Sequence, residues 1–287
     1  MKTNFNKIFL FALLGICLAE PVYAQTPASD SSYHPYYVNY WVTGAISAVG
    51  LFQNYLGIPN IIHKTEVTPA ELSALNKDII NYFDKWALTQ DPSLMEKNQD
   101  ISNFTLTATI VLPVFLLFDT QIRHDWLDIV LMYTEATYIS ANVFSYSFLG
   151  PPFQNRFRPI TYYEQLSETE RKSGNNRNSF YSGHVASAAV ASFFMVKVYS
   201  DYNPQIGDYK YLLYGAAAIP PLLVGYFRIK ALQHFPSDVM IGLGVGALCG
   251  IIIPEFHHIK DKNIKLGLYS TPESTGITVN WQPDFLK

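Results

Sequence analysis

The chain alternates long apolar runs with short polar connections over most of its length. Six runs have helical length, and the second and third are joined only by the short stretch 119–125. Helices joined by short connections pack as antiparallel neighbours. The sequence therefore predicts an all-α fold, a six-helix bundle with helices at 42–58, 104–118, 126–148, 185–198, 211–227 and 239–253.

Two other patterns flank the bundle. Thr68 and Glu71 form a capping box with Pro69 at the first helical position, and apolar residues then recur at helical spacing as far as Trp86. This predicts an amphipathic helix, which either lies on a bilayer surface or, in the interpretation we favour, docks on the bundle. After residue 253 the apolar positions alternate along 264–268 and 277–281, which predicts a short C-terminal β-hairpin.

The first residues have the composition of an export signal. Lys2 and Lys7 precede an apolar run at 8–18, and Ala24 completes a small-residue cleavage site. Such a run is short for a bilayer crossing, which takes roughly 20 residues. We therefore predict cleavage before Gln25 rather than an uncleaved anchor. The mature chain then holds a single cysteine, Cys249, and no disulfide.

Composition favours extensive apolar burial or contact with lipid. Aromatic residues make up 15% of the chain and charged residues 15%, against about 25% charged in an average soluble domain. Several apolar runs are shorter than a comfortable membrane span, and the third contains Asp128 and Glu135. We expect membrane embedding, with a soluble helical bundle as the alternative. The net charge of -3 and the lack of a Lys/Arg cluster discount DNA and RNA as partners.

Chemically informative residues gather in three clusters in the second half of the chain. They are 155–159, with Arg156 and Arg158; Ser182-Gly183-His184; and Arg228 followed by His234 and Asp238. Two imidazoles, several guanidiniums and a carboxylate are the groups that phosphoryl transfer through a histidine nucleophile needs when no metal takes part.

The predicted helix boundaries place these groups. Ser182 to His184 open the fourth helix, where free backbone N–H groups and the positive end of the helix dipole form an anion site, and Gly183 lets an oxyanion approach closely. Pro236 starts the sixth helix, so His234 lies at its entrance with Asp238 one turn on. A carboxylate at that distance can accept a hydrogen bond from one imidazole nitrogen and leave the other as a nucleophile.

Together the clusters resemble the three-part signature of the type 2 phosphatidic acid phosphatases. That superfamily also includes bacterial class A acid phosphatases, lipid A phosphatases and vanadium haloperoxidases. The resemblance covers residues 104–253 and depends most on the third cluster, where Arg228, His234 and Asp238 agree in type, order and spacing. It implies the helical bundle of that family and a hydrolase of phosphoric ester bonds that uses no metal or other cofactor.

The resemblance also implies a role for each residue. His234 would attack phosphorus and form a phosphohistidine, with Asp238 fixing its tautomer. His184 would protonate the leaving oxygen and then activate water. The phosphate oxygens would be held by Arg158, Arg228, Ser182 and the N–H of Gly183.

The chain departs from the family pattern at three positions. The family has Lys where this chain has Pro151, Pro where it has Tyr181, and Ser where it has Phe227. One phosphate-contacting cation is therefore missing, and we expect Arg156 to replace it, because guanidiniums present paired donors to phosphate and remain charged.

We divide the chain into a signal peptide (1–24), an N-terminal aromatic segment with the amphipathic helix (25–102), a catalytic helical bundle (103–256) and a C-terminal tail with the hairpin (257–287). The expected activity is hydrolysis of a phosphomonoester or pyrophosphate, above all on a phosphorylated lipid. We expect an exported, membrane-embedded protein whose active site faces the periplasm. The alternatives are a soluble periplasmic acid phosphatase of broad specificity, a vanadate-dependent haloperoxidase and a non-catalytic envelope scaffold.

Overall fold

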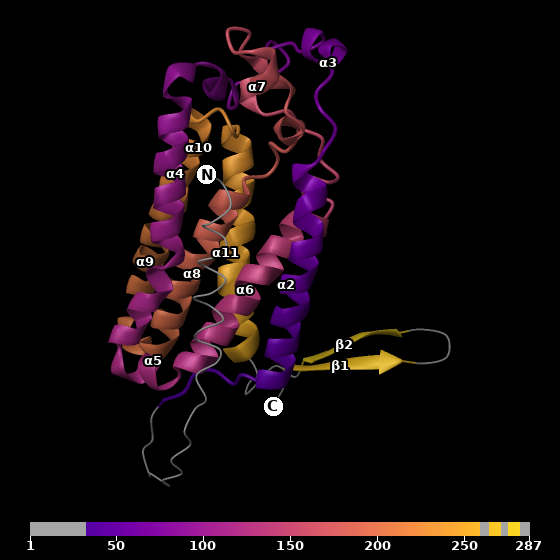
Figure 1. The fold of residues 1–287 in the computed structure, drawn as a ribbon. Helices are drawn as coiled ribbons and strands as arrows, with labels where there is room; N and C mark the ends of the chain where they lie inside the picture. The colour runs from indigo at the N-terminus through magenta and orange to yellow at the C-terminus, as the bar shows by residue number, and fades with distance from the viewer. Residues whose placement is uncertain (1–32, 259–263, 271–274, 282–287) are drawn as a thin grey trace. The chain divides into compact units, whose positions relative to one another are not determined.

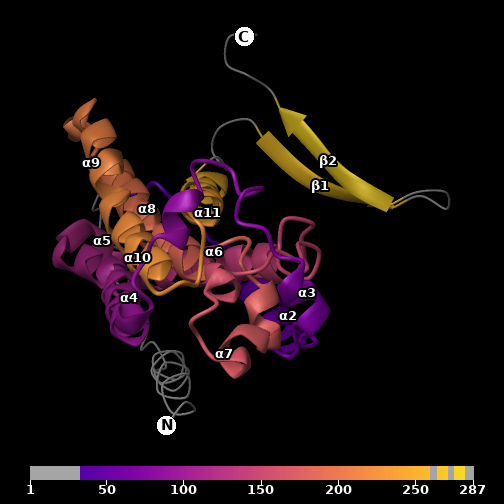
Figure 2. The same ribbon diagram turned by 90° about the horizontal axis from the view of Figure 1, so that it is seen from above.

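A computed structural model describes residues 33–258, 264–270 and 275–281. The predicted signal peptide lies outside the described residues. Within them the chain is mainly helical, and its long helices pack along one another (Figures 1 and 2). These helices are α2 (Tyr40–Ile62), α4 (Met95–Ile110), α6 (Trp126–Tyr146), α8 (Gly183–Tyr202), α9 (Tyr209–Ala217), α10 (Ile219–Lys230) and α11 (Pro236–His258).

Each predicted apolar run is largely helical, but the count of six helices is wrong. The fifth run is split between α9 and α10, because Pro220 and Pro221 lack the N–H groups that would continue α9. The second run leaves α4 and continues as a 3₁₀-helix, η3 (Leu112–Phe118), at Pro113. Shorter helices fill the connections: α3 (Pro69–Ser73), α5 (Thr120–His124), α7 (Glu168–Lys172), η1 (Lys85–Leu88), η2 (Pro92–Leu94), η4 (Pro159–Tyr162), η5 (Gly174–Arg177) and η6 (Pro204–Ile206).

The amphipathic helix predicted to reach Trp86 is wrong in its length. Its capping box is present, since the Thr68 hydroxyl accepts from the Glu71 N–H and the Thr68 N–H donates to the Glu71 carboxylate, but α3 ends at Ser73. Further on, the Asn81 side chain accepts a hydrogen bond from the Asp84 N–H at 3.0 Å. Such side-chain bonds replace helical ones and favour turns.

Helices α8 and α11 pack so closely that glycines of α11 contact the backbone of α8. A Cβ atom added to Gly246 would lie 2.1 Å from the carbonyl oxygen of Ala186, and one added to Gly242 would lie 2.5 Å from that of Ser182. Only glycine allows this approach. The contact at Gly242 places the second turn of α11 directly against the start of α8.

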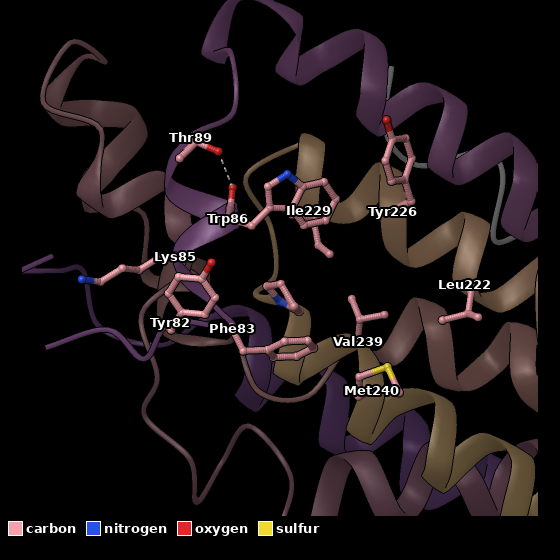
Figure 3. A pocket seen from close by; sticks show the side chains of 11 residues that line it. Tyr82, Phe83, Lys85, Trp86, Thr89, Leu222, Tyr226, Ile229, Val239 and Met240 are labelled. Carbon is pink, nitrogen blue, oxygen red and sulfur yellow. Dashed lines mark hydrogen bonds between the residues drawn. The ribbon is translucent and has the colours of Figure 1, made fainter. Parts of the chain in front are cut away.

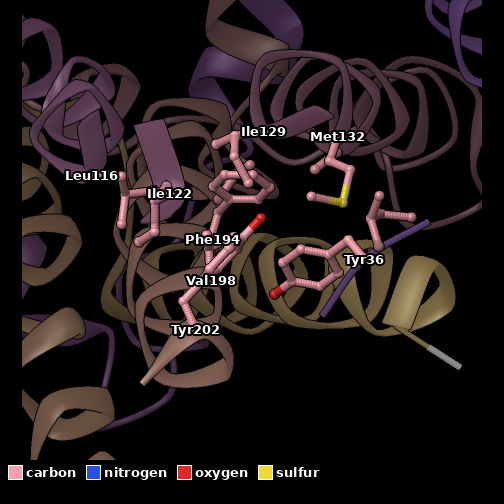
Figure 4. Close-up of a cluster of buried hydrophobic side chains, with 11 residues drawn as sticks. Tyr36, Leu116, Ile122, Ile129, Met132, Phe194, Val198 and Tyr202 are labelled. Atoms are coloured by element: carbon pink, nitrogen blue, oxygen red, sulfur yellow. The ribbon is translucent and has the colours of Figure 1, made fainter. Parts of the chain in front are cut away.

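Two buried apolar clusters hold the bundle together. One lies around the C-terminal half of α8 and is shown in Figure 4, with Tyr36, Met132, Phe194 and Val198 among its members. The other lies near the N-terminal ends of α8 and α11. Its members are Ala87, Tyr162, Val185, Ala188, Val224, Ile229, Phe235 and Val239.

Strands β1 (Ile264–Ser270) and β2 (Thr275–Trp281) are paired antiparallel, with Ile264 opposite Trp281 and Ser270 opposite Thr275. This is the segment in which alternation predicted a hairpin.

Three helical stretches of the described chain are long and apolar enough to cross a membrane. They are 92–118, 209–230 and 236–258. The last two contain α10 and α11, the helices that lead into and out of the loop bearing His234.

Candidate active site

The three sequence clusters meet where α8 and α11 begin. The Ser182 N–H donates to the backbone carbonyl of Asp238 at 3.1 Å, which joins the two helix starts. The Gln233 N–H donates to the carbonyl of Arg228 at 3.0 Å and closes the loop between α10 and α11. The structure therefore brings the predicted catalytic and phosphate-binding residues together in one region.

His234 is buried, and its ring is fixed from one side. Nδ1 lies 2.6 Å from the backbone carbonyl oxygen of Ser179. A carbonyl can only accept, so Nδ1 carries the proton and Nε2 keeps its lone pair. The predicted direct bond from Asp238 is wrong, because its carboxylate is 3.9 Å from Nδ1 and the Ser179 carbonyl takes that place.

Asp238 is connected to His234 by hydrogen bonds through Ser179. Its fully buried carboxylate accepts hydrogen bonds from the Ser179 hydroxyl at 2.6 Å and from the Phe235 N–H at 2.8 Å. The Ser179 hydroxyl and carbonyl thus connect Asp238 to the imidazole. Asp238 fixes the segment that selects the His234 tautomer.

Two buried guanidiniums face this region without a carboxylate of their own. Arg158 donates to the side-chain oxygen of Gln233 and to the Asn178 carbonyl, and Arg228 Nε has no hydrogen-bond partner among the residues that the structure describes. Neither forms an ion pair within the described residues. Burial lowers the pKa of Arg158 from 12.5 to about 10, although Asp238 acts in the opposite direction. Buried charges are normally paired, so this arrangement is suited to an anion.

The start of α8 adds further donors. Within the described part of the chain, the Ser182 hydroxyl is buried without a hydrogen-bond partner and does not cap the helix, and the first N–H groups of α8 have no side-chain cap there. A Cβ atom on Gly183 would lie 3.2 Å from the Phe144 ring. Glycine therefore relieves crowding against Phe144 as well as leaving its backbone accessible.

His184 lies on the same helix start, with Nε2 3.2 Å from the Asn103 side-chain oxygen. Loss of surrounding water lowers its pKa well below the ordinary value, and the charges of Arg228 and Arg158 lower it further. The same three causes, in the same order, lower the pKa of His234. Both imidazoles are therefore neutral before an anion binds.

Arg156 has a different position from the one predicted. Its guanidinium donates to Asp238 at 2.5 Å and to Asp84 at 2.7 Å, and its charged carbon lies 4.4 Å from the centre of the Phe235 ring. Two carboxylates already satisfy this cation. The prediction that Arg156 replaces the missing phosphate ligand is therefore corrected. Arg156 instead bridges the carboxylates of Asp84 and Asp238.

The loop that carries His234 is held in a tight conformation. Leu232 is fully buried and has φ +58°, in the left-handed region that non-glycine residues rarely adopt. The Ile160 N–H donates to the Leu232 carbonyl at 3.1 Å, which ties this loop to the residues after Arg158. Such strain persists because the surrounding contacts fix the loop.

Sequence reasoning missed several residues of the site. Gln233 is adjacent to His234 and Ser179 precedes the second cluster, so proximity was the only signal for either. Asp84 and Asn103 come from distant segments and carried no signal. In the part of the chain that the structure describes, no group of three His, Cys, Asp or Glu side chains is placed to hold a metal ion.

Comparison with known proteins gives one family match. The model of the PAP2 superfamily matches residues 127–262. One solved structure, a transmembrane PAP2-type phosphatidylglycerolphosphate phosphatase from Bacillus subtilis, is similar at 21% sequence identity and a TM-score of 0.41, over 75% of this chain and 94% of that chain. No curated protein matches. The family match ends before β1, so it gives no support to the hairpin. Residues 127–262 of this chain thus match the PAP2 superfamily model, the same superfamily that the three motifs resemble.

Proposed function

We propose that this protein is a phosphohydrolase that works through a phosphohistidine at His234. The observation that carries the proposal is the pairing of a neutral His234, oriented through Nδ1 by Ser179, with the buried guanidiniums of Arg158 and Arg228. A phosphate group would supply the negative charge that these cations lack. The donors stabilise a pentavalent transition state best if they are fixed beforehand.

In the first step the lone pair of His234 Nε2 attacks phosphorus and forms a P–N bond. The P–O bond to the leaving group breaks, and its electron pair goes to the leaving oxygen, which takes a proton from His184. The pKa of His184 is lowered by burial and by the charges of Arg228 and Arg158, but a bound anion raises the pKa of this imidazole and lets it carry that proton. The donors proposed for the equatorial oxygens are Arg158, Arg228, Ser182 Oγ and the Gly183 N–H.

In the second step the neutral His184 takes a proton from water. The resulting hydroxide attacks phosphorus, the P–N bond breaks, and its electron pair returns to His234 Nε2. Inorganic phosphate leaves, and both histidines return to their starting states after His184 releases its proton.

A phosphorylated lipid is the substrate class that we propose. An apolar groove of about 610 Å³ lies between residues 82–89 and helices α10 and α11 (Figure 3). Its walls include Ile229, the neighbour of Arg228, and Pro236, two residues after His234. Both helices belong to candidate membrane spans, so the groove is suited to an acyl chain. Its lining is Tyr82, Phe83, Lys85, Trp86, Thr89, Leu222, Tyr226, Ile229, Pro236, Val239 and Met240.

Phosphate release from a lipid and from a water-soluble phosphomonoester tests both parts of the proposal. Vanadate-inhibited release from either substrate supports the hydrolase. Halide oxidation in the presence of vanadate and peroxide, without phosphate release, would replace it with a haloperoxidase, and neither activity would indicate a scaffold.

Groove-filling substitutions test the lipid. Met240 lines the groove and is 48% exposed, whereas its neighbour Ile241 is 39% exposed and does not line it. Met240→Trp should raise KM for a lipid substrate and leave the soluble substrate unaffected. Ile241→Trp should change neither. Equal effects of the two variants on lipid hydrolysis would remove the groove from the proposal.

We also propose that the site faces the periplasm. In a cysteine-free background, Asn155→Cys places a thiol on the exposed loop beside Arg156. A maleimide that cannot cross the inner membrane should label it in cells with a permeabilised outer membrane. Labelling only after the inner membrane is also disrupted would put the site in the cytoplasm.

A further inference from the structure

The side chain of Asp84 contacts the start of α11 and is fully buried. Asp84 precedes the segment that matches the family model, residues 127–262. It accepts hydrogen bonds from the Ser237 N–H at 2.9 Å and the Ser237 hydroxyl at 2.7 Å. Asn81 and Arg156 donate to it at 2.7 Å each. These bonds outweigh burial, which alone would raise the pKa of Asp84, and hold that pKa below its usual value.

Arg156 carries the connection onward to the site. One of its nitrogens contacts Asp84, and the other donates to Asp238 at 2.5 Å and to the Ser237 hydroxyl at 2.8 Å. The guanidinium thus bridges two fully buried carboxylates. It also lies over the ring of Phe235, the residue that follows His234.

The last links reach the imidazole. Asp238 accepts from the Ser179 hydroxyl, and the Ser179 carbonyl accepts from His234 Nδ1, both at 2.6 Å. The four hydrogen bonds on the path from Asp84 to His234 are therefore 2.5 to 2.7 Å long, and they are joined through the covalent structure of Arg156, Asp238 and Ser179.

We propose that Asp84 is a positioning residue of this active site. By holding Arg156 and Ser237 it fixes Asp238, and through Ser179 it keeps Nε2 of His234 aimed at phosphorus. This inference rests on the proposed function. It assigns the N-terminal segment a part in catalysis that the match at residues 127–262 does not contain.

The charges give the proposal a kinetic signature. Asp84, Arg156 and Asp238 together carry one net negative charge close to an imidazole that becomes cationic when it bonds to phosphorus. Without the charge of Asp84, Arg156 neutralises Asp238 alone, and the developing cation loses that stabilisation. Formation of the phosphoenzyme should slow, while substrate binding should change little.

The experiment compares Asp84→Asn with Asp91→Asn in the full-length protein. Asp91 lies in the same segment and is exposed, and its side chain accepts from the Ser93 N–H without reaching the site. We expect Asp84→Asn to lower kcat by about 10- to 100-fold, with KM within about twofold. Asp91→Asn should match the wild type. An unchanged kcat in Asp84→Asn, or equal losses in both variants, overturns the proposal while an active wild type preserves the proposed function.

Two further measurements support the test: a milder variant of the network, and an NMR signal that does not require the protein to be active. Ser237→Ala removes one hydroxyl from the network but leaves the Asp84–Arg156 pair, so a smaller loss of kcat is expected. Histidine-selective NMR, assigned with His234→Gln, follows the Nδ1–H bonded to Ser179. Its proton resonance should move in Asp84→Asn and stay in Asp91→Asn. A resonance that is identical in all folded variants contradicts the proposal even if the wild type hydrolyses nothing.

Discussion

The two ends of the bundle differ in whether their buried cations are paired with carboxylates. At the end away from the site, Lys197 on α8 pairs with Asp201 at 2.6 Å and with Glu255 on α11 at 2.5 Å. There too, His257 lies 2.9 Å from Glu135. At the other end of the same two helices, Arg158 and Arg228 are buried with no carboxylate partner among the described residues.

We propose that this difference separates charges that stabilise the fold from charges that bind an anionic ligand. Removing one partner of a buried ion pair destabilises the folded protein, because the other charge is left buried and uncompensated. A buried cation without a partner already carries that cost, so its removal should spare stability and harm only function. Two carboxylates, Asp84 and Asp238, do occur near the site, but both pair with Arg156.

The largest effects are expected at the two histidines. His234→Ala should abolish both hydrolysis and covalent labelling by substrate phosphate. His184→Ala should still allow labelling by a substrate with a good leaving group, but hydrolysis of the labelled enzyme should slow. Quench-flow labelling measures the two steps, and equal labelling of both variants contradicts the roles assigned here.

Exchanging a cation at each end tests the comparison directly. Arg228→Gln should reduce kcat/KM by about 10²- to 10³-fold with an unchanged or higher Tm. Lys197→Met should lower stability by about 1–3 kcal/mol, since its carboxylate partners are partly exposed, and leave the folded protein active. Thermal melts and kinetics on both variants provide the measurement. A destabilised Arg228→Gln would show that this guanidinium has a structural role instead.

The close contact of α8 with α11 should be sensitive to a single methyl group. Gly246→Ala forces a clash with the Ala186 carbonyl and should cost about 1–3 kcal/mol. Gly244→Ala, whose Cβ would meet nothing within 4 Å, should be neutral or mildly stabilising. Denaturation of the two variants compares them, and equal Tm values would show that the helices can separate without penalty.

The smallest effect is a pH dependence of anion binding. Because burial and the charges of Arg228 and Arg158 lower the pKa values of His184 and His234, a bound oxyanion should raise these pKa values, and binding should take up protons. Tungstate should therefore bind more tightly as the pH falls from about 8 to about 6, across the ordinary histidine pKa. Calorimetry in two buffers with different ionisation enthalpies measures the number of protons taken up on binding. Release of protons on binding would contradict the prediction.

The same shifts predict how stability depends on pH. The unfolded chain protonates its histidines near pH 6.5, whereas these two stay neutral in the fold, so the free energy of unfolding falls as the pH drops below about 6.5. His184→Gln should lose part of this slope. An identical slope in the variant would mean that His184 is not held neutral.

The sequence predicted the parts of the fold and site that depend on local pattern. The long apolar runs, the capping box at Thr68 and the helix starts at Ser182 and Pro236 all follow from spacing and chain chemistry. Motif spacing also grouped His234 with Arg228. These signals operate within a turn or two of the chain.

What the sequence could not predict depends on distant partners. Nothing near Asp84 indicates that its carboxylate meets Arg156 and Ser237. Helical spacing between Asp238 and His234 suggested a bond that the Ser179 carbonyl makes instead. The helix predicted beyond Ser73 is broken by side-chain bonds that periodicity does not record.

Mapping the covalent intermediate tests the central claim most directly. The purified protein would be quenched during turnover of a ³²P-labelled substrate, kept at neutral or alkaline pH to preserve a phosphoramidate, and the labelled peptide sequenced. We predict acid-labile phosphate on the imidazole of His234. Phosphate on another residue, or full turnover with no phosphoenzyme at any quench time, would contradict it.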